Sequence, residues 1–151
     1  MTDLPYRPFT DDAAIRHVGE GLIARTLPRA EWTHEAHLGA TLWLLRDRQD
    51  IDVDAEIATI ISRYNESVGG VNDATQGYHD SITRAFVAGI RAHLVGRPWD
   101  EPLVDCVNAL LALPAGQRDW PLHFYSRGLL NSTVARLSFV PPDLAPFPTA
   151  C

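Results

Sequence analysis

The chain has 151 residues, of which 46% are hydrophobic, and it carries a formal net charge of −6. This length and composition predict one domain with one sizeable core, and the absence of a cluster of basic residues argues against a nucleic-acid partner. No run of about 18 apolar residues exists, so we expect no membrane span. The acidic, proline-bearing start does not read as a signal peptide, which favours a cytoplasmic location.

All 13 basic residues are arginine, and lysine is absent from the sequence. A protein without lysine cannot form an internal Schiff base with pyridoxal phosphate, so we expect no pyridoxal phosphate cofactor. It also lacks the lysine nucleophile and the phosphate-binding lysine of a P-loop.

The first part of the chain predicts an arm and two helices. Residues 1–9 are expected to be extended, because Pro5 and Pro8 interrupt any helix there. Tyr6 and Phe9 are expected to pin this arm to the body. A first helix should run from residue 10 or 11 to about residue 26, where apolar residues recur with the helical period. Thr33 is a good N-cap for a second helix to about residue 45. Its apolar residues go most of the way round, which is typical of a buried central helix.

Three further segments predict the remaining main helices. Asp52 should cap a third helix to about residue 67, a fourth should run from about 77 to 95, and Asp100 should cap a fifth. Pro121 suits the start of a short helix and Ser132 the start of another, whereas residues 140–151 form a proline-rich, irregular tail. The sequence therefore predicts an all-α, single-domain helical bundle of residues 1–151, with four or five main helices plus short C-terminal helices.

Polar residues gather where three of these helices begin or end. His34 and His37 start the second helix with a spacing that places their side chains about 5–6 Å apart on one face. If the second, third and fourth helices are successive antiparallel neighbours, the end of the third lies near the starts of the other two. The polar residues expected at that end of the bundle are His34, His37, Tyr64, Asn65, His79 and Thr83.

Three histidines at one point would form a three-nitrogen metal site with an open position. That arrangement is typical of catalytic zinc or another divalent first-row metal, so His34, His37 and His79 are the predicted ligands. Asp80 or Glu35 would then be a fourth ligand, an orienting group or a general base acting on bound water. Tyr78, Asp80 and Arg127 are the candidate catalytic residues.

Several motifs resemble those of an uncharacterised bacterial family of small helical proteins. They are WTHEAHL at 32–38, RYN at 63–65, GYHDSIT at 77–83, FYSRGLL at 124–130 and FVPPDL at 139–144, so the resemblance covers about residues 32–144. It implies that Tyr125, Ser126 and Arg127 share one architecture with the histidines, and it implies no activity. The family usually has glutamate where this chain has Asp80. The shorter side chain weakens a role for Asp80 as a direct ligand.

Three functional interpretations follow from these residues. The first is a metal-dependent hydrolase or lyase that acts on a small molecule through metal-bound water. The second is a metal-free pocket for a small anion, in which the N-terminus of the second helix, His37 and Arg127 supply positive potential. The third is a structural or interaction domain in which the histidines satisfy buried polar groups.

Overall fold

The computed structural model describes residues 7–149, and the regular elements of this part are all helices. Two short helices, α6 (Arg127–Leu130) and α7 (Thr133–Leu137), and three 3₁₀ turns follow or connect the main ones. The predicted all-α fold is therefore confirmed. The main helices are α1 (Asp12–Ala24), α2 (His34–Asp47), α3 (Val53–Ser67), α4 (Asp80–Leu94) and α5 (Leu103–Leu111).

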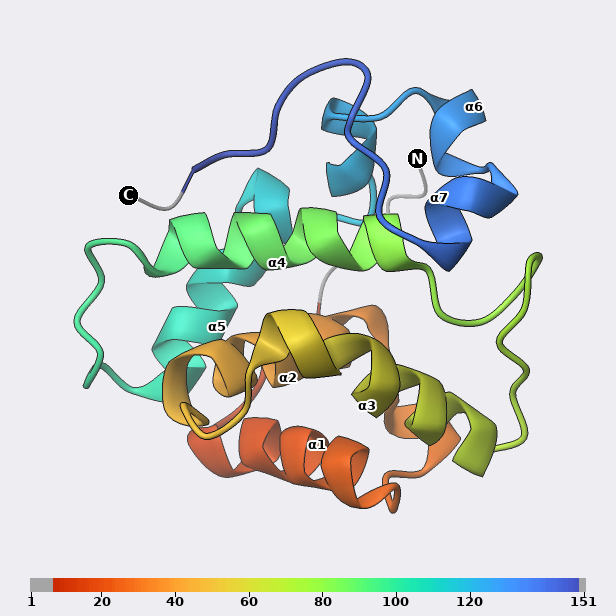
Figure 1. Ribbon diagram of the computed structural model, residues 1–151. Coiled ribbons are helices and arrows are strands. Elements are labelled where there is room, and N and C mark those ends of the chain that lie inside the picture. Colours follow the sequence, from red (N-terminus) through yellow and green to blue (C-terminus); the bar gives the residue numbers. More distant parts are fainter. Residues whose placement is uncertain (1–6, 150–151) are drawn as a thin grey trace.

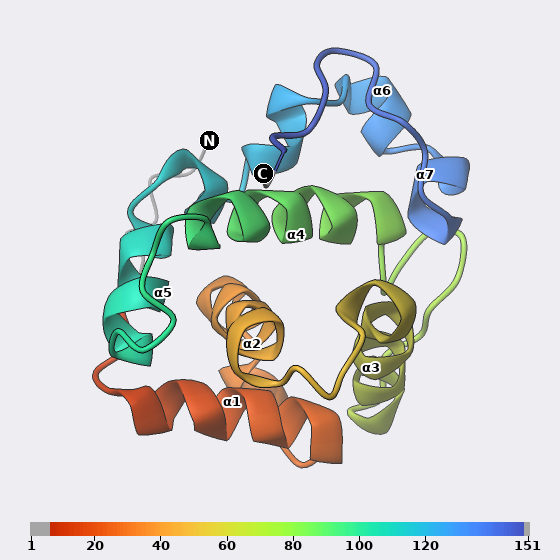
Figure 2. The same cartoon turned by 60° about the vertical axis from the view of Figure 1, so that its left-hand side comes forward.

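Helix α2 lies at the centre of the packing, as its apolar sequence predicts. It contacts α1, α4 and α5, and Figure 2 shows it nearly end-on between them. Helix α3 packs on α1 beside it, and α4 crosses above, with α6 and α7 on the far side of α4 (Figure 1). Leu38, Leu42 and Leu44 of α2 are almost completely buried. No helix within residues 7–149 is long and apolar enough to cross a membrane.

The predicted N-caps Thr33 and Asp52 are confirmed by hydrogen bonds, because each side chain accepts the backbone N–H three residues further on. Asp11 caps α1 in the same way. The expectation that Asp100 caps α5 is wrong. Helix α5 begins after Pro102 without a cap from its own segment, and the Val104 N–H donates instead to Asp12 of α1 at 2.8 Å. Because this acceptor comes from a distant part of the chain, no local sequence pattern indicates it.

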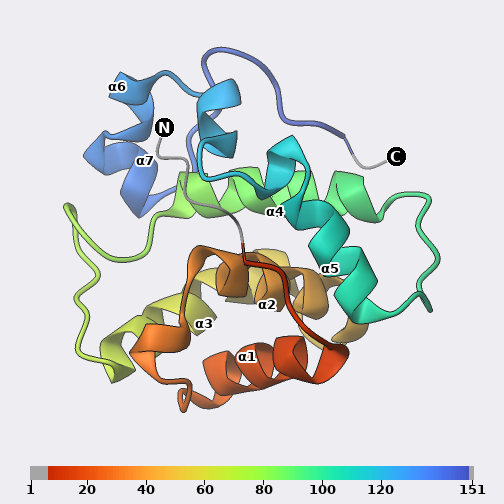
Figure 3. The same ribbon diagram turned by 180° about the vertical axis from the view of Figure 1, so that it is seen from behind.

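The N-terminal arm is fixed to the body by Phe9, as expected, and runs beside α2 in Figure 3. The Phe9 backbone N–H and C=O both bond the Asn108 side chain of α5, at 2.9 and 3.0 Å. The Phe9 ring lies over Gly39, where an added Cβ would come within 2.9 Å of it. Because Gly39 has no side chain, the Phe9 ring of the arm can pack against α2 at this point. The remainder of the predicted arm, residues 1–6, lies outside the described residues.

The C-terminal region is more broken than the sequence predicts. The expected helix from Pro121 is divided into a 3₁₀ turn, Trp120–His123, and α6, because Ser126 caps a new helix and its own N–H donates to Asp143. Ser132 caps α7 as expected.

The proline-rich tail is irregular through residue 149, as predicted, and residues 150 and 151 lie outside the described part. Phe147 packs against the rings of Phe124 and Tyr125. Leu144 is 61% exposed, and its backbone N–H donates to the Phe124 carbonyl.

Candidate functional site

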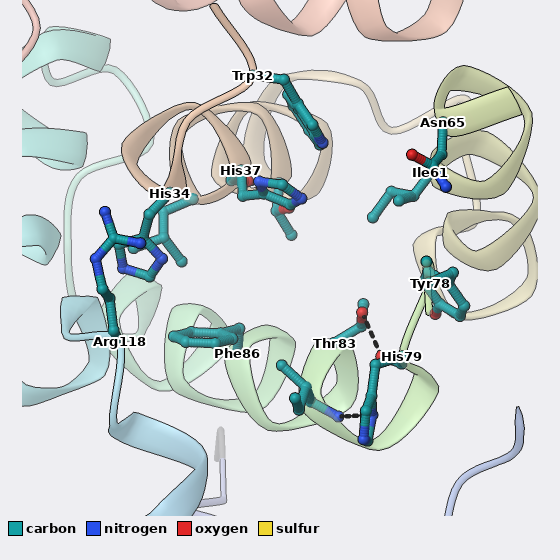
Figure 4. Close-up of a pocket in the computed structure, with 14 residues that line it drawn as sticks. Trp32, His34, His37, Ile61, Asn65, Tyr78, His79, Thr83, Phe86 and Arg118 are labelled. Atoms are coloured by element: carbon teal, nitrogen blue, oxygen red, sulfur yellow. Dashed lines mark hydrogen bonds between the residues drawn. The ribbon is translucent and has the colours of Figure 1, made fainter. Parts of the chain in front are cut away.

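A cavity of about 500 Å³ lies between α2, α3 and α4 (Figure 4). This volume is within the range of small-molecule binding sites, which are concave and mostly apolar with a few polar groups. Leu38, Ile61, Ile82 and Phe86 supply apolar walls. The other lining residues are Trp32, His34, His37, Thr41, Asn65, Gly77, Tyr78, His79, Thr83 and Arg118.

The structure brings together most of the polar residues that were expected to meet. His34, His37, Asn65, His79 and Thr83 all line this cavity. Tyr64 does not, because its side chain is fully buried and its hydroxyl donates to the Leu27 carbonyl at 2.9 Å.

The loop between α3 and α4 is fixed by Asn72, which bonds both of its ends. Its side-chain oxygen accepts from the Asn65 amide at 3.0 Å and from the Tyr78 backbone N–H at 2.9 Å. Its amide nitrogen donates to the Ser62 carbonyl of α3 at 2.9 Å. Gly77 has a φ of +83°, and an added Cβ would collide with Asn72, so the close approach requires glycine.

His79 has a structural role in which both ring nitrogens are used. Its Nδ1 accepts the Ile82 N–H at 3.1 Å and caps α4, while its Nε2 donates to the Leu130 carbonyl at 2.7 Å. A neutral imidazole has one donor and one acceptor nitrogen, so these two bonds complete its capacity. The ring therefore ties the start of α4 to α6.

His34 and His37 each use one ring nitrogen and leave the other without a bond among the described residues. The Nε2 atom of His34 donates to the Gly116 carbonyl at 2.8 Å, and the Nδ1 atom of His37 donates to the Thr33 carbonyl at 3.1 Å. A carbonyl oxygen only accepts, so the proton lies on the bonded nitrogen in each ring. In the neutral form, the other nitrogen presents a lone pair.

Burial keeps these histidines neutral. Desolvation lowers the pKa of His37 to about 4, against the opposing effect of its bond to Thr33. Desolvation also lowers the pKa of His34 and of His79, and the positive charge of Arg118 lowers that of His34 further. At neutral pH the cavity thus contains uncharged imidazoles.

The predicted three-histidine ligand set is not formed in the described structure. Within residues 7–149, no group of three or more histidine, cysteine, aspartate or glutamate side chains is arranged to hold a metal ion. The physical reason is His79, whose only lone pair already accepts the cap bond of α4.

Tyr78 and Asp80, two of the three candidate catalytic residues, bond each other. The Tyr78 hydroxyl donates to Asp80 at 2.7 Å, and Arg84 pairs with the same carboxylate oxygen at 3.3 Å. Burial, followed by the bond to Asp80, raises the pKa of Tyr78 well above its ordinary value. Tyr78 lines the cavity, whereas Asp80 is not among the lining residues.

Glu35 faces away from the cavity and lines a separate hollow of about 290 Å³ beside α1. Its side chain is 7% exposed, its Oε1 has no hydrogen bond among the described residues, and the Arg7 Nε lies 3.9 Å away. Glu35 is therefore not placed to join His34 and His37 at one metal.

The arginine at the cavity is not the one expected from the sequence. Arg127 is the exposed first residue of α6 and does not line the cavity. Arg118 lines it instead and lies beside His34 in Figure 4. It is brought there because the bond from His34 to Gly116 holds the segment after α5 against α2. No local pattern around Arg118 indicates this placement.

Fold and cavity define an all-α domain with a small-molecule-sized pocket enclosed by three helices. Comparisons with protein-family models, with curated proteins and with solved structures found no match. The functional interpretation therefore depends on the geometry of the cavity.

Proposed function

We propose that the cavity binds a small organic anion with an apolar, preferably aromatic, body, and that binding requires no metal ion. The apolar walls suit such a body, and Trp32 and Phe86 offer aromatic faces on opposite sides of the space (Figure 4). The proposal concerns binding and assigns no reaction.

The position of Arg118 is the main observation that supports this proposal. It is the one formally charged side chain that lines the cavity, and no acidic residue lines it among residues 7–149. Within the same residues its guanidinium has no hydrogen bond or ion pair. A guanidinium without a protein partner at the edge of an apolar pocket favours a carboxylate or a similar planar anion.

The metal-dependent interpretation has less support from this geometry. A three-histidine centre would need His79 to give up its cap bond to Ile82 or its bond to Leu130. Either loss would leave a polar group of the protein without its partner.

Binding of phenylacetate, compared with its uncharged amide, phenylacetamide, tests the proposal. Chemical-shift changes of the backbone amides should report both affinities, and we expect the largest changes at residues that line the cavity. The variant Arg118→Gln should weaken phenylacetate binding by about fivefold, the effect of one exposed ion pair, and should leave phenylacetamide binding unchanged.

The matched control is Arg127→Gln, which removes an exposed arginine outside the cavity. It should change neither affinity. Equal binding of acid and amide, or equal losses in both variants, would overturn the assignment of an anion site to Arg118.

A further inference from the structure

The polar groups inside the cavity are mainly hydrogen-bond acceptors. The hydroxyl of Thr41 donates to the His37 carbonyl at 2.7 Å, and that of Thr83 donates to the His79 carbonyl at 2.9 Å. The Tyr78 hydroxyl is likewise donated to Asp80. Apart from Arg118 and the indole N–H of Trp32, each side chain with a donor at the cavity already bonds a protein acceptor.

The Nε2 atom of His37 is the acceptor with the best-defined orientation. The ring is held by its Nδ1 bond to Thr33, and the Trp32 ring lies against it with centroids 3.8 Å apart. Figure 4 shows the ring projecting from α2 toward the open space between the helices. Its Nε2 carries no proton in the neutral tautomer and has no partner among the described residues.

We infer that the ligand of this cavity presents a hydroxyl or N–H donor to the Nε2 atom of His37, an inference that rests on the proposed function. A ligand without a donor would cover this nitrogen and remove it from water without replacing the hydrogen bond. Sites built to bond a substrate hydroxyl discriminate strongly against analogues that lack it. The ligand class is therefore an aromatic acid that also bears a hydroxyl or N–H group.

The test compares 3- and 4-hydroxyphenylacetate with their methyl ethers, which keep the carboxylate and the ring but cannot donate. At least one hydroxy acid should bind about tenfold more tightly than its own ether, the effect of one neutral hydrogen bond. In protein labelled with ¹⁵N-histidine, the Nε2 resonance of His37 should move upfield with that acid, because the nitrogen accepts a hydrogen bond, and should not move upfield with the ether.

The variant His37→Phe keeps an aromatic ring against Trp32 and removes the lone pair. It should abolish the preference for the hydroxy acid over its ether, because the variant has no acceptor at this position. His17→Phe is the control, because His17 is an exposed residue of α1 that does not line this cavity. The preference should persist in it.

The possible results separate this inference from the function on which it rests. If phenylacetate and both hydroxy acids bind with no preference over the ethers, the donor assignment is wrong and the anion site stands. If none of these acids binds, the proposed function fails as well. The nitrogen resonance of the unmodified protein decides the question even if His37→Phe does not fold.

Discussion

Replacing His79 with alanine should lower the free energy of unfolding by about 2–4 kcal/mol. The variant loses the cap of α4, which contributes about 1 kcal/mol, and leaves the buried Leu130 carbonyl without a donor, which costs about 1–3 kcal/mol. The bond to Leu130 is 2.7 Å long and buried, and the cap bond is 3.1 Å long and partly buried. Urea denaturation followed by circular dichroism measures the effect.

Two further variants separate the contributions of the cap bond and of the bond to Leu130 to the free energy of unfolding. His79→Asn should retain the cap, because asparagine is a favourable N-cap, but its side chain is too short to reach Leu130, so an intermediate loss is expected. His123→Ala, at an exposed position, is the control and should change stability little. A His79→Ala variant that kept full stability but lost a stoichiometric metal would restore the three-histidine interpretation.

The second large effect is a loss of stability on mild acidification that depends on His37. Its pKa is about 4 in the folded protein and 6.5 for an unperturbed group. As the pH falls below about 6.5, the unfolded chain takes up a proton that the folded protein does not bind until the pH approaches 4. The stability contributed by neutral His37 is thus present above pH 6.5 and is lost toward pH 4, by up to about 3 kcal/mol.

The variant His37→Gln isolates this contribution. His34 and His79 also have lowered pKa values and act in the same direction, but they are present in both proteins and cancel in the difference. Carboxylates with lowered pKa values, such as Asp54 beside Arg91, act at lower pH. The stability of the unmodified protein should therefore fall more steeply than that of the variant between pH 6.5 and 4. Parallel curves in this range would contradict a desolvated, neutral His37.

The sequence predicts the helices well because their signals are local. Thr33 and Asp52 bond backbone groups three residues away, and the apolar surface of α2 is visible as a pattern within that helix. The start of α5 has no such local signal, because the Val104 N–H is satisfied by Asp12, 92 residues distant. Likewise, Ser126 divides the expected C-terminal helix because Asp143 reaches its backbone N–H from the tail.

In the cavity, too, contacts between distant residues could not be predicted from the sequence. The ends of α2, α3 and α4 could be predicted to meet from helix order alone, and five polar residues at these ends do line one space. The orientation of two of the rings could not be predicted, because His34 and His79 are oriented by Gly116 and Leu130, carbonyls 82 and 51 residues away. Arg118 depends on the first of these contacts, so sequence reasoning selected Arg127 in its place.

The bonds of Asn72 divide the α3–α4 loop into two parts, which are expected to tolerate changes in sequence and length to different degrees. Residues 73–76 are exposed, and Asp73 satisfies the N–H groups of Thr75 and Gln76 within the tip itself. Gly77 and Tyr78, by contrast, belong to the cavity wall and are held through Asn72 to the last turns of α3. Insertions at the tip would leave the binding space unaltered. Related chains that diverged in ligand preference would be expected to differ instead at Asn72 or at the residues it bonds.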